Sequence, residues 1–119
     1  MTLAFYGLKN CDTCKKAMKA LDQAGVAFNF KDVRSEPPGP EQLLRWLAAV
    51  GKDRLINKRS TTWRSLDPAD RNTEGDEDIV SLLGAYPTLI KRPVIEDGDE
   101  VYVGWGKSEE KALLNKDFS

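Results

Sequence analysis

The chain has 119 residues, a length that suits one domain and is short for two ordinary ones. Its 18 lysines and arginines almost balance its 19 aspartates and glutamates, which argues against direct nucleic-acid binding through a general basic surface. The first residues lack the basic start and apolar core of a signal peptide, and no apolar run approaches the length of a membrane span. We therefore expect a single-domain cytoplasmic protein with no membrane partner.

Both cysteines of the chain lie in a Cys-x-x-Cys motif, Cys11 and Cys14. Residues 3–6 before the motif are apolar and predict a short buried strand. After the motif, apolar residues recur at helical spacing, with a glycine where a C-cap would fall: Cys14, Ala17, Met18, Leu21, Ala24 and then Gly25. The motif is thus expected at a helix N-terminus, where amide groups and partial positive charge favour a thiolate. Cys11 is predicted to be the exposed, activated sulfur, with Cys14 close enough to form a disulfide with it.

Three other interpretations of the two cysteines compete with a redox site. Cysteine is often buried and simply packs. A zinc site would need more ligands, but the sequence has no histidine and no third cysteine, so we predict no metal site. A structural disulfide would stabilise little, because it would close a very short loop. Cys-x-x-Cys beside a strand and a helix is typical of thioredoxin-like redox proteins, and we favour that interpretation.

The next stretch predicts a strand and a helix. Residues 26–30 are rich in β-favouring residues, and a strand there would run parallel to the first because a helix connects the two. Residues 35–40 form a proline-rich break, after which Pro40 suits the first turn of a helix. The expected apolar positions of this helix are Leu43, Leu44, Leu47 and Val50. Trp46 lies between them and faces either the core or a partner, and Gly51 is expected to cap the helix end.

The middle of the chain is first basic and then acidic. Residues 53–66 are irregular and carry Arg54, Lys58, Arg59 and Arg64. This run is either a solvated face or a source of guanidinium groups for an anion held near Cys11. A polar loop over residues 67–78 ends in three acidic residues, which are expected at a helix start because negative charge is stabilising there. The apolar stripe of that helix is expected to be Ile79, Leu82, Leu83 and Tyr86, with Pro87 ending it.

The C-terminal stretch predicts a hairpin and a helix. Residues 94–96 and 101–103 read as antiparallel strands joined by a turn at 97–100. Pro93 lacks an amide donor and is tolerated at a strand start, or as a cis bond in a tight turn. Ser108 is expected to cap a last helix that runs to Asn115, with Glu109 and Glu110 in its first turn.

Four segments in order resemble the arsenate reductase (ArsC) family of the thioredoxin fold, which includes the Spx regulators and the YffB-like proteins. They are residues 6–13, 55–66, 89–93 and 103–105, and the likeness is greatest to YffB-like members. The resemblance implies an α/β, thioredoxin-like fold (β-α-β … β-β-α) with an inserted helical segment between the two halves. It implies one domain over residues 1–119, with residues 1–36 and 87–119 as the core and 37–86 as the helical insertion.

The resemblance also implies the residues of a site. Cys11 would be the nucleophile, Arg92 the anion partner and Pro93 a cis proline that faces the active site, with Cys14 as redox partner. Substrate or glutathione binding would fall to Lys9, Asn10, Thr13, Asn57, Arg59 and Arg64. Glutathione would be a co-substrate, and no cofactor would be tightly bound. Because the chain has no histidine, activation of Cys11 must come from the helix terminus and from arginine or lysine.

The chain departs from the glutathione-dependent arsenate reductases at two of the three arginines that surround their cysteine. Only Arg92 matches. The middle arginine falls on Asn57, with Arg59 two residues away, and the last falls near Trp105, with Lys107 beyond it. A site that lacks two of its cations would bind arsenate poorly, so we do not expect arsenate as the natural substrate.

Two functions follow from this resemblance. The first is a glutathione-linked thiol oxidoreductase of the arsenate reductase-like type, which acts on a small thiol or an oxyanion and has glutaredoxin as a candidate partner. The second is a Spx-like regulator whose Cys11–Cys14 pair switches binding to RNA polymerase. Cys14 matches the Spx switch, and Gly51 lies where Spx proteins carry a glycine that contacts the polymerase. The likeness to YffB around Trp63 and Arg64 favours the enzyme.

Overall fold

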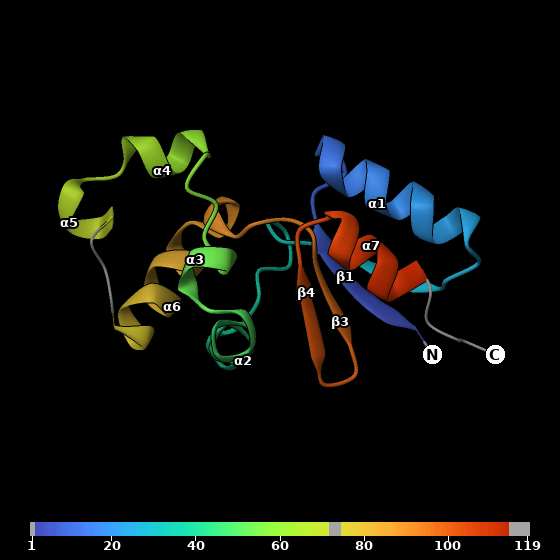
Figure 1. Cartoon of the computed structure of the whole chain (residues 1–119). Helices are drawn as coiled ribbons and strands as arrows, with labels where there is room; N and C mark the ends of the chain where they lie inside the picture. Colours follow the sequence, from blue (N-terminus) through green and yellow to red (C-terminus); the bar gives the residue numbers. More distant parts are fainter. Residues whose placement is uncertain (1, 72–74, 115–119) are drawn as a thin grey trace. The chain divides into compact units, whose positions relative to one another are not determined.

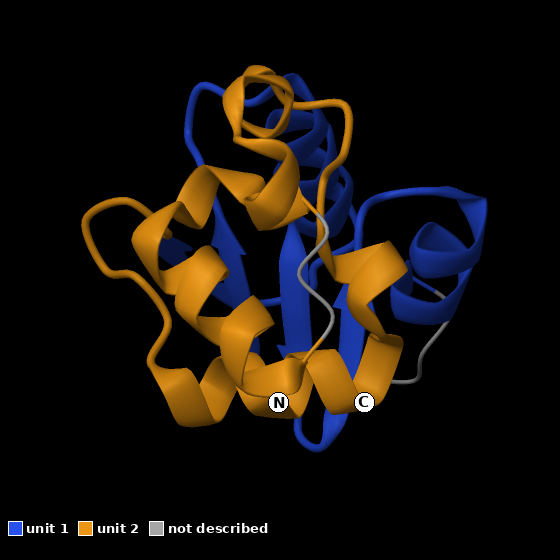
Figure 2. Ribbon diagram, turned by 90° about the vertical axis from the view of Figure 1, so that its left-hand side faces the viewer, with its two compact units in different colours: residues 1–32, 92–119 blue, residues 33–91 orange. Residues whose placement is uncertain are grey.

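The computed structural model describes residues 2–71 and 75–114. The chain divides into two compact units (Figure 2). Unit 1 comprises Met1–Asp32 and Arg92–Ser119, and unit 2 comprises Val33–Lys91. Both ends of the chain therefore contribute to unit 1, and unit 2 is inserted between them.

Unit 1 contains a four-stranded sheet (Figure 1). Its strands are β1 (Leu3–Gly7), β2 (Phe28–Asp32), β3 (Val94–Asp97) and β4 (Glu100–Val103), in the spatial order β2-β1-β3-β4. Strands β1 and β2 run parallel, as expected for strands that a helix connects, here α1 (Asp12–Gln23). Strand β3 is antiparallel to β1 and forms a hairpin with β4.

The core of unit 1 lies between this sheet and two helices, α1 and α7 (Lys107–Leu114), which contact each other. Alternate residues of β1, Leu3 and Phe5, point into the core, as the pleat of a strand requires. They are joined by buried side chains of α1, β3 and α7: Cys14, Ala17, Leu21, Ile95 and Leu113. Both helices thus cover the same face of the sheet, and Cys14 is part of the core.

Unit 2 is mainly helical. Its elements are α2 (Pro40–Val50), α3 (Lys52–Leu55), α4 (Thr61–Ser65), α5 (Pro68–Arg71), α6 (Asp76–Ala85) and the 3-10 helix η1 (Pro87–Leu89). Helices α2 and α6 pack against each other. An antiparallel bridge joins Ile56 to Ile90, and beside it the amide of Asn57 donates to the carbonyl of Leu89 at 2.7 Å. This bridge ties the two ends of the helical segment that follows α3.

The element order confirms the fold class predicted from the sequence, a thioredoxin-like α/β fold with a helical segment between its β-α-β and β-β-α halves. The parallel pairing and the hairpin are also as predicted. Gly51 caps the end of α2 with φ of 82°, and the Arg92–Pro93 peptide bond is cis. The boundaries at residues 36 and 87, and the union of both units in one domain, stay predictions.

The buried stripe of α2 differs from the prediction. Leu43, Trp46 and Leu47 are buried, whereas Leu44 is 40% exposed and Val50 is only half-buried. A helix turns one face to the interior, and the face that carries Trp46 buries more apolar surface than the face that carries Leu44. Trp46 is therefore an interior residue, which decides the alternative that the sequence left open.

Two helix ends also differ from the prediction. Helix α6 ends at Ala85, so Tyr86 leaves the apolar stripe and is 42% exposed, while Val80 is buried instead. Helix α1 ends at Gln23, so Ala24 is an exposed C-cap residue rather than part of the buried stripe. Beyond the last helical residue, side chains no longer follow the helical period, which accounts for both differences.

The remaining differences concern where elements begin. Strand β2 starts later than residue 26, and α5 lies within the predicted loop 67–78. The stretch 53–66, expected to be irregular, contains α4 and most of α3. Helix α7 starts at Lys107, because the Gly106 amide donates to Oε1 of Glu109 at 3.4 Å and Gly106 takes the N-cap place. Ser108 therefore lies inside the first turn and is not the cap, and Asn115 falls outside the described residues. Among the residues that the structure describes, no helix is long and apolar enough to cross a membrane.

Candidate active site

Cys11 is the N-cap residue of α1. Its backbone is extended, with φ of −90° and ψ of 125°, and its carbonyl accepts the amide of Lys15 at 2.9 Å, the first hydrogen bond of the helix. The Cys11 amide donates to the carbonyl of Leu8 at 3.2 Å, which closes the turn between β1 and α1. The side chain is half-buried. This places the sulfur at the helix end where backbone amides lack partners within the helix.

Cys14 lies three residues further on, inside the first turn of α1, and is completely buried. It packs in the core of unit 1 among residues that include Leu3 and Phe5 of β1. Its sulfur lies close to Gly7, at which an added Cβ atom would come within 2.6 Å of it. Both cysteines are free thiols in this structure. The two sulfurs therefore belong to different environments, one at the edge of the core and one within it.

The pKa of Cys11 is lower than its ordinary value of 9.0. Burial alone would raise this pKa, because a thiolate is poorly solvated inside a protein. Hydrogen bonding from the amide and the thiol of Cys14, the positive charge of Arg92 and the amide of Thr13 together outweigh burial. The Cys11 side chain makes no capping hydrogen bond in α1, but a thiolate at this position also lies at the positive end of the helix dipole. At neutral pH more thiolate is present at Cys11 than at an ordinary cysteine.

Burial, and to a smaller extent the neighbouring Cys11, raises the pKa of Cys14, which is about 12 overall. Hydrogen bonding to the backbone at Leu8 and the charge of Arg92 offset only part of this rise. Cys14 therefore keeps its proton at neutral pH. A protonated Cys14 can donate a hydrogen bond to the Cys11 thiolate, which ties the properties of the two sulfurs together.

Arg92 and Pro93 stand directly before β3, in the same unit as the cysteines. Arg92 is half-buried and acts electrostatically on both sulfurs, so the predicted cation and the predicted nucleophile are brought together. The carbonyl of Pro93, which is buried, accepts the amide of Gly104 at 2.8 Å. That bond continues the β3–β4 hairpin to the edge of the site and fixes the backbone from which Arg92 extends.

Three further predicted residues surround Cys11 in sequence: Lys9, Asn10 and Thr13, all exposed. The ammonium of Lys9 lies 5.9 Å from the ring centroid of Phe30 in β2, a cation–π distance that holds this lysine near the sheet end. The amide of Thr13 acts on the Cys11 thiolate, as described above. Asn10 occupies the turn between β1 and α1.

The model of the ArsC family matches residues 6–113. The chain belongs to the ArsC family. An uncharacterised protein of Haemophilus influenzae is 38% identical over 112 residues, which cover 94% of this chain and 98% of the relative. A solved structure of a YffB protein is 38% identical, with a TM-score of 0.87, and the match covers 94% of this chain and 98% of that chain. The global transcriptional regulator Spx of Streptococcus mutans is 27% identical over 111 residues, 92% of this chain and 80% of the relative.

These matches confirm the predicted relationship to ArsC, YffB and Spx proteins. The ArsC-family fold, with a cysteine at the N-terminus of its first helix, suits a thiol-dependent oxidoreductase. The described part of the chain holds no group of three or more histidine, cysteine or carboxylate residues that could bind a metal ion.

The other predicted binding residues of this ArsC-family chain, Asn57, Arg59 and Arg64, lie in unit 2. Oδ1 of Asn57 accepts the amide of Arg59 at 3.2 Å, and this contact shapes the loop that precedes α4. Ser60 caps α4 by accepting the amide of Trp63 at 3.1 Å. Arg59 and Arg64 are exposed. Their action on the sulfur of Cys11, which lies in unit 1, stays a prediction.

Sequence reasoning gave no role to Gly7 or to the individual amides of Thr13 and Cys14. A glycine at the end of a strand can signal close approach of another element, and that signal is present at Gly7. Backbone amides leave no such signal, because every residue except proline carries one.

Proposed function

We propose that this ArsC-family chain is a glutathione-linked thiol oxidoreductase of the arsenate reductase-like type, with Cys11 as its nucleophile. The observation that carries the proposal is the position of Cys11 at the start of α1, with its pKa lowered against the effect of burial by the amide and thiol of Cys14 and by Arg92. A thiolate is the reactive form of cysteine, so a lowered pKa at a half-buried, accessible sulfur suits nucleophilic attack. The reaction would take place in the cytoplasm, where small thiols are kept reduced.

In the proposed reaction, the Cys11 thiolate attacks one sulfur of oxidised glutathione. The disulfide of glutathione breaks, one glutathione leaves as a thiolate, and Cys11 is left in a mixed disulfide with the other. A thiolate of glutaredoxin then attacks the glutathione sulfur of the mixed disulfide, takes over that glutathione as a new mixed disulfide and releases Cys11 as a thiolate. Reduced glutathione also releases Cys11, but its attack reverses the first step and re-forms oxidised glutathione. Arg92 would stabilise the negative charge as it passes between sulfurs.

Cys14 has two roles in this proposal. Its thiol donates a hydrogen bond to Cys11, and it is also the redox partner that can close a Cys11–Cys14 disulfide. Because its pKa is about 12, little of Cys14 is thiolate at neutral pH. Attack by Cys14 on the mixed disulfide would therefore be slow, and an external thiol is the faster route back to free Cys11.

The anion-binding part of the proposal rests on Arg92, Lys9 and the helix start, with Asn57, Arg59 and Arg64 contributing if both units act as one domain. Glutathione carries carboxylates, for which exposed cations such as Lys9 and Arg59 provide partners. Asn57 stands where arsenate reductases have an arginine, so a sulfur substrate suits this chain better than arsenate does.

A second candidate function is a Spx-like regulator that binds RNA polymerase according to the redox state of Cys11 and Cys14. Two observations favour it: the likeness to Spx of Streptococcus mutans and the adjacency of the two thiols. Gly51, with φ of 82° at the exposed end of α2, would be a contact residue. Capture of purified RNA polymerase by only one redox form of the protein would support this function, and equal failure of both forms would exclude it.

The deciding experiment is intact-mass analysis after incubation with oxidised glutathione, followed by peptide mapping. The proposal expects one glutathione on Cys11, which reduced glutathione then removes. Cys11→Ser should abolish the adduct, whereas Cys14→Ser, the matched control, should still form it. A protein lighter by two hydrogens, with Cys11 joined to Cys14 and no lasting adduct, would favour the regulator. Absence of reaction at either sulfur near neutral pH would refute an activated Cys11.

A further inference from the structure

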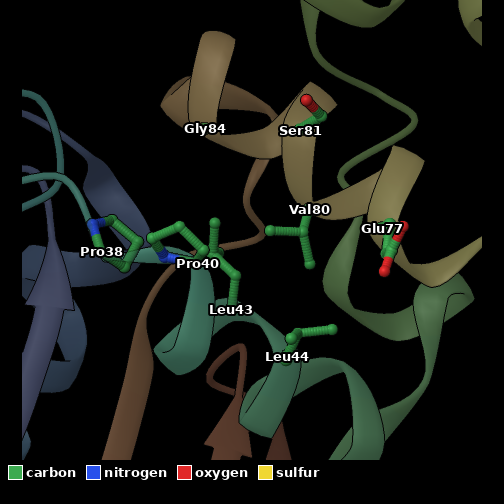
Figure 3. Close-up of a pocket in the computed structure, with 8 residues that line it drawn as sticks. All are labelled: Pro38, Pro40, Leu43, Leu44, Glu77, Val80, Ser81 and Gly84. Atoms are coloured by element: carbon green, nitrogen blue, oxygen red, sulfur yellow. The ribbon is translucent and has the colours of Figure 1, made fainter.

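Unit 2 contains a pocket between α2 and α6, with a volume of about 440 Å³ (Figure 3). Its lining consists of Pro38, Pro40, Leu43, Leu44, Glu77, Val80, Ser81 and Gly84. A cavity of about 150 Å³ already holds a benzene molecule. The pocket thus has the size of a small-molecule site rather than of a packing defect.

The lining is apolar along most of its length and polar on one side. Glu77, Ser81 and Gly84 follow one another at helical spacing and therefore share one face of α6. Figure 3 shows Glu77 and Leu44 at one end of the pocket and Pro38 and Pro40 at the other. A bound molecule would meet a carboxylate at one end and hydrocarbon elsewhere.

Gly84 lines the pocket near the C-terminal end of α6. A Cβ atom added there would have no heavy atom within 4 Å, so no neighbouring group requires a glycine at this position. Glycine is also a poorer helix former than alanine. The open space beside Gly84 thus forms part of the pocket that a ligand would fill.

The charge at the Glu77 end is negative. Asp76, Glu77 and Asp78 occupy the first turn of α6. Of these three residues only Glu77 lines the pocket, and its full negative charge exceeds the partial charge of about +0.5 that the helix N-terminus contributes. The end of the pocket therefore favours a cation and disfavours a carboxylate or phosphate.

We propose that this pocket binds a small molecule that has an apolar chain and a cationic amine. The chain lies between α2 and α6, and the ammonium group pairs with Glu77. The path along α6 from Glu77 to Gly84 is about 10 Å, which sets the length of the apolar part. This site lies within unit 2 and uses neither cysteine. The proposal therefore does not depend on the proposed redox function.

The test uses octylamine as the probe, with octanol and octanoate as comparison molecules that share its eight carbons but have a neutral or an anionic head group. Backbone amide signals of the full-length protein are followed by ¹H–¹⁵N NMR during titration with each probe. The expected result is saturable shifts in α2 and α6, with octylamine binding about fivefold more tightly than octanol, the effect expected of one partly exposed charge pair. Octanoate should bind more weakly than both.

Two variants locate the binding. Glu77→Gln should reduce octylamine binding to the level of octanol, and Gly84→Leu should weaken all three probes by filling the pocket. The control Asp99→Asn removes an exposed carboxylate of the β3–β4 turn and should change nothing. Glu77→Gln changes only an exposed side chain and should fold normally. Its effect on octylamine binding therefore tests the proposal even if Gly84→Leu fails to fold.

Three outcomes would overturn the proposal. If octanoate bound as tightly as octylamine, Glu77 would not recognise the ammonium group. If the NMR shifts were confined to regions outside α2 and α6, the probes would bind elsewhere than in this pocket. Binding of a peptide that carries leucine and lysine, with no binding of octylamine, would assign the pocket to a protein partner. Dimerisation that Leu44→Glu abolishes would assign it to a second copy of the chain.

Discussion

A Cβ atom at Gly7 would lie 2.6 Å from the sulfur of Cys14. Gly7 is the last residue of β1, and Cys14 lies in the first turn of α1, so the strand and the helix that carry the motif approach more closely than a side chain would allow. The same contact holds Cys14 in the core, while Cys11 stands half-buried at the helix start. The different acidities of the two thiols thus follow from how one helix packs on one strand.

The substitution Gly7→Ala should lower the free energy of unfolding by about 1–3 kcal/mol, the usual effect of overpacking a dense core. The new methyl group would meet both the Cys14 sulfur and the ring of Phe5, 3.1 Å away. Urea unfolding measures the effect, and Gly39→Ala is the control because a Cβ there has open space. In a double-mutant cycle, Gly7→Ala should destabilise the Cys14→Ala variant less than it destabilises the parent protein. Equal stability of Gly7→Ala and the parent protein would refute the close approach.

Iodoacetamide at neutral pH should modify Cys11 and spare Cys14. Cys11 is half-buried with a lowered pKa, whereas burial gives Cys14 a pKa of about 12 and leaves none of its surface exposed. The rates should differ by at least about tenfold, because only the thiolate reacts and only an accessible one is reached. Peptide mapping at early times measures this difference, and labelling in urea, where both cysteines are exposed, is the control. Comparable rates in the folded protein would contradict the assignment.

Removal of the charge in Arg92→Gln should raise the pKa of Cys11. Burial already opposes the thiolate, and Arg92 is one of the groups that compensate, so its loss makes the charged form less favourable. The rate of alkylation should then rise with pH around a higher midpoint, and the rate at pH 7 should fall. Lys19→Gln, which removes an exposed positive charge further along α1, is the control and should leave the midpoint in place. An unchanged midpoint in Arg92→Gln would exclude electrostatic activation by this residue.

The pKa of Cys14 also predicts how stability changes at alkaline pH. Burial raises this pKa from 9.0 to about 12, so the folded protein keeps a proton that the unfolded chain loses in this range. The unfolded state binds fewer protons, and the stability contribution that is complete below pH 9 is lost as pH rises toward 12. Urea unfolding of the parent protein and of Cys14→Ala at pH 8, 9 and 10 measures this loss of stability. The parent should lose more stability than the variant, and parallel losses would contradict a buried, protonated Cys14.

Most of the fold could be predicted because local signals and tertiary packing agree. The apolar run before the cysteines, the β-favouring run after the first helix and the turn around Gly98 each indicate an element that the sheet then uses. Where different sets of buried residues fit the same helical pattern, the sequence could not predict which set is buried. Leu44 and Trp46 both fit the period of α2, and only packing selects which of them is buried.

The candidate site could be predicted in part. Cys11 and Arg92 could be predicted from their residue types, because a thiol at a helix start and a nearby cation together favour a reactive thiolate. The amides of Thr13 and Cys14 contribute to the acidity of Cys11 through position alone, and residue type carries no information about them. The importance of Gly7 depends on a distance to Cys14 that no pattern of residues specifies.

The structure and the apolar pattern of α2 predict different effects of truncating Trp46 and Leu44, because the structure buries Trp46 and leaves Leu44 partly exposed. Trp46→Ala should lower the free energy of unfolding by about 3–5 kcal/mol, because it leaves a large cavity in place of a completely buried side chain. Leu44→Ala should change it by no more than about 0.5 kcal/mol, because Leu44 is substantially exposed. Urea unfolding of both variants gives the comparison, in which each serves as the control for the other on the same helix. If Leu44→Ala cost as much as Trp46→Ala, α2 would have to turn its other face inward, and the pocket between α2 and α6 would lose the leucine that lines its acidic end.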